Sequence, residues 1–372
     1  MGAKVIKIER PGGDDSRRSG PFRGNTPHPE KSLRFWYHNA GKLGISLDLS
    51  SRRGRDIFLR LAGKSDVVVE TFPPGYLKKI GLHYDALSER NPGLILASVT
   101  GFGQSGPYHL YKSSDLIASA LGGQMYVSGT QETQPLKPYG QQPYYAASLF
   151  AAIGILTALH ERHRSGKGQH IDISLQEAVA ATLEHVMVRY FYERAVPRRQ
   201  GNLHWTNSAS LLPCKDGYIL LTFAREWETL VNLLDSEGMA ADLKDERWRE
   251  EDYRQQYINH IIDVLSAWTK THTTGELFEM GQLMRFPWAP VCSPGEVLAS
   301  PQLKAREFFV PVKHPESGDS PVYPGVPGKL SGSSWEIRGR APLIGEHNTR
   351  VYRDELGLTE EDLTRLATEK VI

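Results

Sequence analysis

The hydrophobic positions in the first half of the chain alternate between short apolar runs and longer segments with apolar residues at helical spacing. The short runs predict buried strands, and the longer segments predict helices. We predict strands over residues 4–9, 44–49, 67–70, 94–99 and 170–175, and helices over residues 52–63, 84–90, 116–121, 148–164 and 176–193. Strands that alternate with helices are typical of an α/β fold with a mainly parallel sheet.

The second half of the chain has a different rhythm, with one predicted strand at residues 217–222 and then helices around residues 226–237, 253–270 and 274–284. Polar, irregular residues precede it, and a Pro/Gly-rich segment follows it. We therefore predict a large domain from residues 1–196 and 325–372, a linker at 197–212, a small α+β domain at 213–310 and a return linker at 311–324.

The composition is that of an ordinary globular protein, with 40% hydrophobic and 23% charged residues among 372. A net charge of +1 argues against nucleic acid as the main partner. No apolar run approaches the roughly 18 residues expected of a membrane span, and we predict that the longest, residues 149–159, is a buried helix. The start of the chain contains no apolar signal core, and two cysteines make neither a disulfide framework nor a metal site. We therefore expect a cytoplasmic protein.

Four blocks punctuated by glycine, proline or small polar residues follow one another between residues 65 and 175. They are Asp66–Gly75, Asn91–Pro107 (which contains Gly101-Phe-Gly-Gln-Ser-Gly-Pro107), Ser114-Asp115 and Thr157–Leu175 (which contains Ser165-Gly-Lys-Gly168). In this order the blocks resemble those of the family III CoA-transferases, of the formyl-CoA/carnitine type. The resemblance implies a Rossmann-like large domain formed by both chain ends, a small inserted α+β domain, and two chains interlocked as a dimer. It also implies coenzyme A or an acyl-CoA as substrate, a carboxylic acid as acceptor, and no metal. Family members have a strand and a helix before the strand at residues 4–9, so we expect that this chain lacks a first βα unit.

The resemblance places the nucleophile of the reaction at Tyr144. In this family an aspartate attacks the thioester, carries CoA as an aspartyl thioester and passes it to the acid. Residues 133–160 contain no Asp or Glu, and counting back from residues 153–156 or from residues 159–162 gives Tyr144 both times. A phenol has no carbonyl on which to carry a thioester, and with an ordinary pKa of about 10 it is protonated at neutral pH. We therefore predict that this chain alone does not follow the usual route.

The same resemblance assigns binding residues to CoA and one further acid to the reacting group. Each has a structural alternative: a solvated charge, core packing or a turn. The predicted CoA residues are Arg10, Lys42, Thr71, Phe72, Lys79, Ile80, Gly101, Phe102, Gly103 and Lys112. Asp115 is predicted either to lie near the acyl group or to cap the helix at residues 116–121.

These features favour a CoA-transferase subunit that lacks its own nucleophile and works with a paralogous chain that carries the aspartate. The resemblance suggests a precedent for such a subunit: heteromeric members of the family that activate benzylsuccinate with succinyl-CoA. Two other functions stay open. One is a stand-alone acyl-CoA enzyme, a homodimer that uses Tyr144 as acid or hydrogen-bond donor for direct transfer or isomerisation. The other is a CoA-binding or structural subunit without catalysis.

Overall fold

The computed structural model describes residues 2–204 and 206–372, and the chain forms two compact units. Unit 1 is built from Met1–Lys112, Tyr145–Leu175 and Val297–Ile372, so both ends of the chain belong to it. Unit 2 is built from Ser113–Tyr144 and Gln176–Glu296. The domain limits predicted from the sequence remain a prediction, because these units describe packing within one chain and not independent folding.

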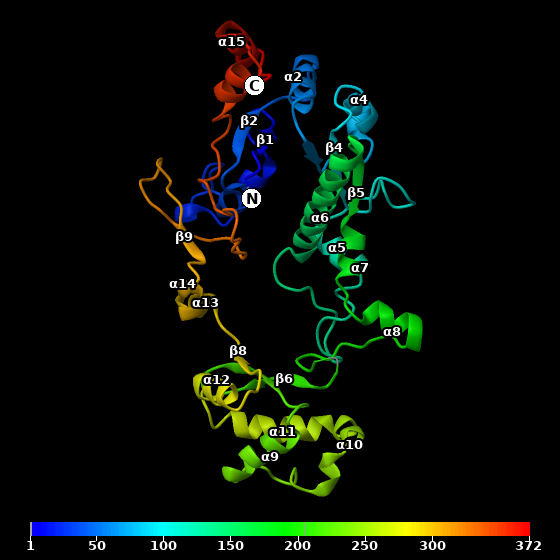
Figure 1. Ribbon diagram of the computed structural model, residues 1–372, viewed down its shortest axis with the longest axis vertical. Coiled ribbons are helices and arrows are strands. Elements are labelled where there is room, and N and C mark those ends of the chain that lie inside the picture. Colours follow the sequence, from blue (N-terminus) through cyan, green and yellow to red (C-terminus); the bar gives the residue numbers. More distant parts are fainter. Residues whose placement is uncertain (1, 205) are drawn as a thin grey trace. The chain divides into compact units, whose positions relative to one another are not determined.

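The main strands of unit 1 pair in parallel, which confirms the predicted α/β class (Figure 1). β1 (Ile6–Glu9) pairs with β2 (Leu43–Ser46) in one sheet. A second sheet has the order β3 (Val67–Glu70), β4 (Ile95–Thr100), β5 (His170–Ser174). β4 is the central strand and is almost wholly buried, as expected for the middle of a parallel sheet.

Helices and two short strands complete unit 1. The α-helices are α1 (Leu33–Asn39), α2 (Arg52–Ala62), α3 (Tyr76–Lys79), α4 (Tyr84–Ser88), most of α6 (Gln142–Ser165), part of α13 (Pro294–Ala299), α14 (Pro301–Ala305) and α15 (Glu360–Thr368). The shorter elements are the 3-10 turns Asp15–Arg18 and Arg23–Asn25, the π-helical Thr349–Glu355, and the antiparallel pair β9 (Phe309–Pro311) and β10 (Val322–Pro324). Ser32 and Ser51 cap α1 and α2 with their hydroxyls.

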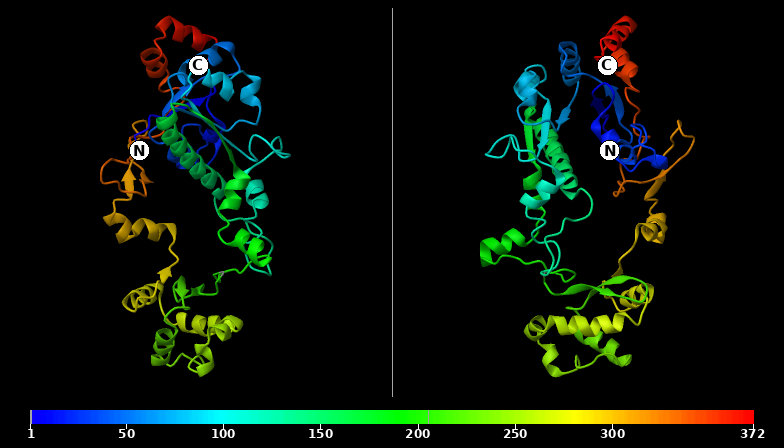
Figure 2. Two further views of the ribbon diagram at one scale, coloured as in Figure 1. Left: turned by 45° about the vertical axis from the view of Figure 1, so that its right-hand side comes forward. Right: turned by 180° about the vertical axis from the view of Figure 1, so that it is seen from behind.

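The end of the chain packs onto β2 and α2, so residues far apart in the sequence share one core. The Tyr352 hydroxyl donates to the Ser46 carbonyl at 2.6 Å, and the Asp48 amide donates to the Val371 carbonyl at 2.8 Å. Burial raises the pKa of Tyr352, which keeps its hydroxyl protonated as a donor. Figure 2 shows the red C-terminal segment beside the blue segment that contains α2 in both views.

α6 is longer than predicted and is not a buried helix within the single chain. It begins at Gln142, ahead of the predicted start at residue 148, and packs on β5 where Gly154 approaches Ile171. Much of its apolar surface is nevertheless exposed, with Leu149 at 66%. Among the described helices it is long and apolar enough to cross a membrane by length and composition, which is weak support for a membrane protein. The prediction of burial was wrong for the isolated chain because the pattern identifies an apolar face and not what covers it.

Unit 2 has its own core around a small antiparallel sheet, ordered β6 (Ala209–Pro213), β7 (Tyr218–Thr222), β8 (Ala289–Pro290). Its helices are α5 (Asp115–Leu121), nearly all of α7 (Leu175–Ala181), α8 (Val186–Glu193), α9 (Trp227–Ser236), the 3-10 turn Glu246–Arg249, α10 (Glu251–Gln256), α11 (Ile258–Thr269) and α12 (Thr274–Leu283). Four buried tryptophans, Trp227, Trp248, Trp268 and Trp288, belong to this core.

Two helices predicted as continuous are broken in unit 2. The helix predicted at residues 176–193 divides into α7 and α8 near Glu184, whose φ of 28° does not fit a right-handed helix. The helix predicted at residues 253–270 divides into α10 and α11 at Tyr257, with φ −110° and ψ 30°. The break comes from backbone angles that the apolar spacing does not encode.

Candidate active site

Tyr144 lies in the first turn of α6, and its hydroxyl meets the start of α5. The Asp115 amide donates a hydrogen bond to the Tyr144 hydroxyl oxygen at 3.2 Å. The tyrosine side chain is 41% exposed, so the ring reaches toward solvent in the single chain. Because the oxygen accepts this bond, the phenol keeps its own hydrogen to donate to another group. The geometry therefore suits a hydrogen-bond donor and not a carrier of CoA.

Asp115 is buried beside this hydroxyl at 8% exposure, as the first residue of α5. The helix cap is Ser114, whose hydroxyl accepts from the Ile117 amide at 3.3 Å, so the alternative that Asp115 caps this helix was wrong. Asp115 Oδ2 lies 3.1 Å from Lys137 Nζ. Oδ1 has no hydrogen-bond partner among the residues that the structure describes.

Lys137 is the site residue that the sequence analysis missed. Besides Asp115, it donates to the Pro138 carbonyl at 3.0 Å and to the Gly140 carbonyl. It thus ties the start of α5 to the loop before α6. A signal existed, because Lys137 is the sole Lys or Arg in the acid-free residues 133–160. An isolated cation in a stretch without carboxylates needs a partner from elsewhere in the chain.

Arg10 and Lys42 occupy opposite ends of the β1–β2 pair. Arg10 follows the carboxyl end of β1, where its Nε donates to the Gly13 carbonyl at 3.2 Å and its guanidinium pairs with Asp15. Lys42 precedes β2, and its Nζ donates to Asn39 Oδ1 at 3.0 Å. The structure therefore does not bring these two predicted CoA residues together directly. A single phosphate group cannot bridge a parallel strand pair from end to end.

Lys42 belongs to a group of cations. Burial lowers its pKa first, and the nearby Lys7 lowers it further. Burial, Arg34 and Lys42 together lower the pKa of His38, whose ring lies 5.7 Å from that of Tyr145. Cations that depress one another's protonation favour an anion between them, because the anion relieves the repulsion. This part of unit 1 is thus suited to a phosphate or a carboxylate.

The residues that follow β3 form a turn and a short helix. The Phe72 amide donates to Glu70 Oε2 at 2.6 Å, and the Phe72 ring lies 4.7 Å from that of Tyr76. Thr71 and Lys79 are exposed, whereas Ile80 packs on the core of unit 1. Thr71, Phe72 and Lys79 are thus accessible to a ligand, whereas packing alone explains Ile80.

The loop that follows β4 contains Gly101, Phe102 and Gly103, with Lys112 exposed farther along. Gly103 has φ 86°, and a Cβ there would lie 3.3 Å from the Asp172 carboxylate. The Gln104 amide donates to Asp172 Oδ2 at 2.8 Å. Glycine is needed at this position because the conformation is left-handed and the carboxylate of β5 is close. The loop therefore has a defined backbone at the carboxyl edge of the sheet, where α/β proteins bind ligands.

Known proteins resemble this chain in both sequence and fold. The model of CoA-transferase family III matches residues 1–348. The chain belongs to CoA-transferase family III. It is 36% identical to the succinyl-CoA:(R)-benzylsuccinate CoA-transferase subunit BbsE of Thauera aromatica, over 94% of this chain and 87% of that one. It is 32% identical to the succinyl-CoA–D-citramalate CoA-transferase of Chloroflexus aurantiacus, over 100% of this chain and 92% of that one.

A solved structure supports the same assignment. The crystal structure of a CAIB/BAIF family protein from Brucella suis superposes with a TM-score of 0.84 and 31% identity, covering 95% of this chain and 92% of that chain. The match to the family model includes all the candidate residues named above. Membership in CoA-transferase family III thus confirms the resemblance, while the roles of individual residues stay predictions.

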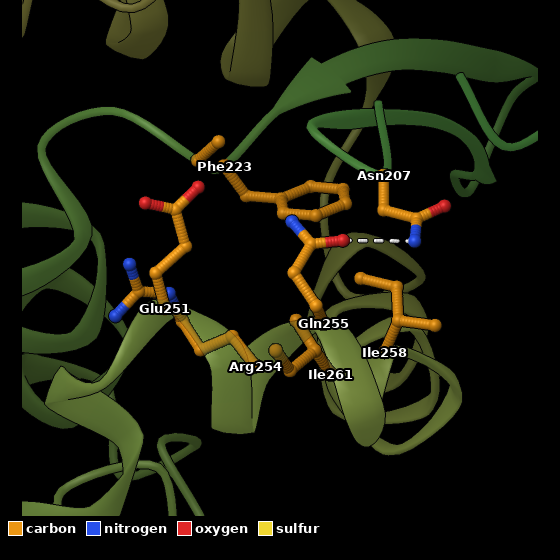
Figure 3. Close-up of a pocket in the computed structure, with 8 residues that line it drawn as sticks. Asn207, Phe223, Glu251, Arg254, Gln255, Ile258 and Ile261 are labelled. Atoms are coloured by element: carbon orange, nitrogen blue, oxygen red, sulfur yellow. Dashed lines mark hydrogen bonds between the residues drawn. The ribbon is translucent and has the colours of Figure 1, made fainter. Parts of the chain in front are cut away.

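A small pocket in unit 2 contains none of these candidates. Figure 3 shows the Asn207 and Gln255 side chains facing each other, with a hydrogen bond of 2.9 Å from Asn207 Nδ2 to Gln255 Oε1. Arg254, which also lines the pocket, donates to the carbonyls of Trp248 and Arg249. Since Asn207, Gln255 and Arg254 already have hydrogen-bond partners within unit 2, the pocket belongs to the packing of the unit. Among the described residues no group of three or more His, Cys, Asp or Glu could hold a metal ion.

Proposed function

We propose that this chain is a CoA-transferase subunit that moves CoA between an acyl-CoA, such as succinyl-CoA, and a carboxylic acid, while a paralogous partner chain supplies the nucleophilic aspartate. The observation that carries the proposal is that residues 133–160, where the resemblance places the nucleophile at Tyr144, contain no Asp or Glu, in a chain that matches the family over residues 1–348. One relative is named as a subunit, and both transferases compared above are named for succinyl-CoA.

The chemistry explains why the partner is needed. An aspartate attacks the thioester carbonyl and expels CoA thiolate, which then attacks the aspartyl carbonyl of the mixed anhydride and releases the first acid. The second acid then attacks the aspartyl thioester and expels the thiolate, which attacks the acyl carbonyl of the new mixed anhydride and releases the aspartate. The second and third of these steps take place at the carbonyl carbon of the aspartyl group, and Tyr144 has no such carbon.

In this proposal the chain contributes binding groups and a hydrogen-bond donor. CoA is held by Arg10, Lys42, Thr71, Phe72, Lys79, Ile80, Gly101, Phe102, Gly103 and Lys112. Tyr144 donates to an oxygen of the acyl group, with Asp115 beside it. Both cysteines are free thiols, which fits a cytoplasmic, reducing location.

The partner is proposed to interlock with this chain as the family resemblance implies. Exposed apolar surface supports this assembly. The outer face of α6 exposes Leu149, Ile153 and Leu156, and α8 has no buried residue in the single chain. Helices with an uncovered apolar face usually bury it in an assembly.

The test compares the purified chain alone with the chain bound to an aspartate-bearing paralogue from its native host. We expect transfer from succinyl-CoA, and a hydroxylamine-sensitive enzyme intermediate, with the complex only. Tyr144→Asp is the informative variant of the single chain, and Tyr139→Asp is its control, because Tyr139 is 98% exposed in the preceding loop. Transfer with such an intermediate by the unaltered chain alone would contradict the proposal.

A stand-alone acyl-CoA enzyme is the second candidate, and the free hydrogen of the Tyr144 hydroxyl favours it. Here Tyr144 would donate to the thioester oxygen during direct transfer or isomerisation. We would then expect turnover without a partner that is lost in Tyr144→Phe. If neither arrangement turns over but calorimetry detects CoA binding, the chain is a non-catalytic CoA-binding subunit.

A further inference from the structure

The Tyr144 hydroxyl is held from the start of α5. The Asp115 amide donates to the hydroxyl oxygen at 3.2 Å, and Asp115 is the first residue of that helix. Amides in the first turn of a helix have no partner within the helix, so this one is free to bond elsewhere. The Tyr144 side chain is 41% exposed, so packing restrains its ring less than it would restrain a buried one. The direction of the hydroxyl therefore depends on where α5 begins relative to α6.

Lys137 connects the start of α5 to the loop before α6. Its ammonium lies 3.1 Å from Asp115 Oδ2, and it donates to the Pro138 carbonyl at 3.0 Å and to the Gly140 carbonyl. An ammonium has three protons, so these three oxygens use all of its donors. The lysine thus joins the segment that holds the Tyr144 oxygen to the segment that leads into the Tyr144 backbone.

Neighbouring contacts do not replace this connection. The Ser114 hydroxyl accepts from the Ile117 amide at 3.3 Å, which caps α5 but does not tie it to α6. Asp115 Oδ1 has no hydrogen-bond partner in the described part of the chain, so the carboxylate is held through Oδ2 and Lys137. Without the lysine, the start of α5 and the amide that it presents to Tyr144 lose this restraint.

A hydrogen-bond donor acts in catalysis when it lies about 2.7–3.1 Å from the oxygen that gains charge, and a displacement of about 1 Å can cost about a hundredfold in rate. We propose that Lys137 is a positioning residue, which through Asp115 sets the direction in which the Tyr144 hydroxyl donates to the acyl oxygen. Lys137 touches no reacting group itself, because its protons are bound to Asp115 and to two carbonyls. This inference rests on the proposed function, since it takes Tyr144 as the donor.

The test is a double-variant cycle on the complex with the aspartate-bearing paralogue, assayed for transfer from succinyl-CoA. Lys137→Met should lower kcat about tenfold and leave KM within about twofold, because it displaces a group without removing a contact to the substrate. Tyr144→Phe should lower kcat by at least about tenfold, because the donor itself is lost. The double variant should have the kcat of Tyr144→Phe alone, because the hydroxyl that Lys137 positions is then absent.

Two further variants separate positioning from a general loss of stability. Lys137→Arg should keep kcat within about threefold of the unaltered complex, since a guanidinium still donates to the Asp115 carboxylate and to a carbonyl. Thr269→Val is the control, because Thr269 is fully buried and its hydroxyl donates to the Pro213 carbonyl at 2.8 Å. It should lower the melting temperature and leave kcat and KM unchanged. All rates are measured at a temperature at which circular dichroism shows each variant folded.

The proposal is overturned if Lys137→Met lowers kcat by the same factor with and without the Tyr144 hydroxyl, or if it raises KM and leaves kcat unchanged. In either case Lys137 acts on another group, and the proposed function stands. If Tyr144→Phe keeps the kcat of the unaltered complex, the donor role of Tyr144 fails together with this inference, while the hydroxylamine-sensitive intermediate still tests the aspartate of the partner. If the complex transfers no CoA, the proposed function and this inference both fail.

Discussion

The ion pair of Asp115 and Lys137 leads to an unusual prediction about stability. The carboxylate is buried, and one of its oxygens has no hydrogen-bond partner in the described part of the chain. Lys137 has two carbonyl acceptors besides Asp115 and a side chain that is 26% exposed. The two partners are therefore not equivalent. Removing the lysine leaves a buried charge alone, and neutralising the aspartate leaves a lysine that is still solvated and hydrogen-bonded.

We expect Lys137→Met to lower the free energy of unfolding by about 2 kcal/mol at neutral pH, the usual cost of losing a hydrogen bond to a buried charge. Asp115→Asn should cost about 0.5 kcal/mol, because the amide oxygen still accepts from the lysine. The double variant should lower the free energy of unfolding by about 1 kcal/mol, because an unpaired neutral amide is less costly to bury than an unpaired carboxylate. Asp115→Asn would thus destabilise the unaltered protein but stabilise the Lys137→Met variant.

The assay is urea unfolding followed by tryptophan fluorescence, because the four buried tryptophans named above report on unit 2, which contains the pair. Lys244→Met is the matched control: Lys244 pairs with Asp235 at 2.9 Å in the same unit, but both side chains are about half exposed. That exposed pair should contribute less than about 0.5 kcal/mol. Additive single-variant costs, or equal costs for Lys137→Met and the control, would refute the reasoning.

Three further predictions follow from other parts of the chain. A Cβ at Gly168 would lie 1.8 Å from the Leu94 carbonyl oxygen, so Gly168→Ala should cost about 3 kcal/mol or more in urea unfolding followed by circular dichroism. Gly275→Ala is the control, because a Cβ at this position of α12 meets no other atom. It should stabilise the protein by up to about 1 kcal/mol, and a loss of stability would contradict the explanation by steric contact. Burial, above all, lowers the pKa of His314 below 6.5, so the unfolded chain binds more protons and the free energy of unfolding should fall as the pH drops below about 6.5; His314→Gln should flatten that dependence. Lys42→Met should weaken CoA binding about tenfold and reduce its salt dependence in calorimetry, and unchanged affinity would remove Lys42 from the site.

The strands of unit 1 were predictable because their signal is local. Apolar runs such as residues 67–70 and 170–175 are bounded by turn residues, and β3 and β5 lie there within one residue. The parallel pairing followed from the intervening helices, since a crossover brings successive strands into the same direction. Helix ends were less predictable, as the early start of α6 and the break near Glu184 illustrate.

The candidate site was predictable in part. Glycine at position 103 has a local physical reason, the left-handed backbone, and the loop could be identified from its composition. The contact of Lys137 with Asp115 joins residues 22 positions apart, and neither residue has a neighbour in the sequence that indicates the other. The Asp115 oxygen that lacks a partner among the described residues is likewise invisible in a sequence, because burial depends on the surrounding chain.

The sequence by itself determined the family, the parallel α/β class and the absence of Asp and Glu from residues 133–160, because each depends on residue types in a fixed order. Only the tertiary structure decided that the Tyr144 hydroxyl accepts from the Asp115 amide, that a lysine neutralises this aspartate, and that α6 leaves an apolar face uncovered in the single chain. The physical reason is distance: hydrogen bonds and burial act between atoms within a few ångströms, and the folding of the chain brings those atoms together.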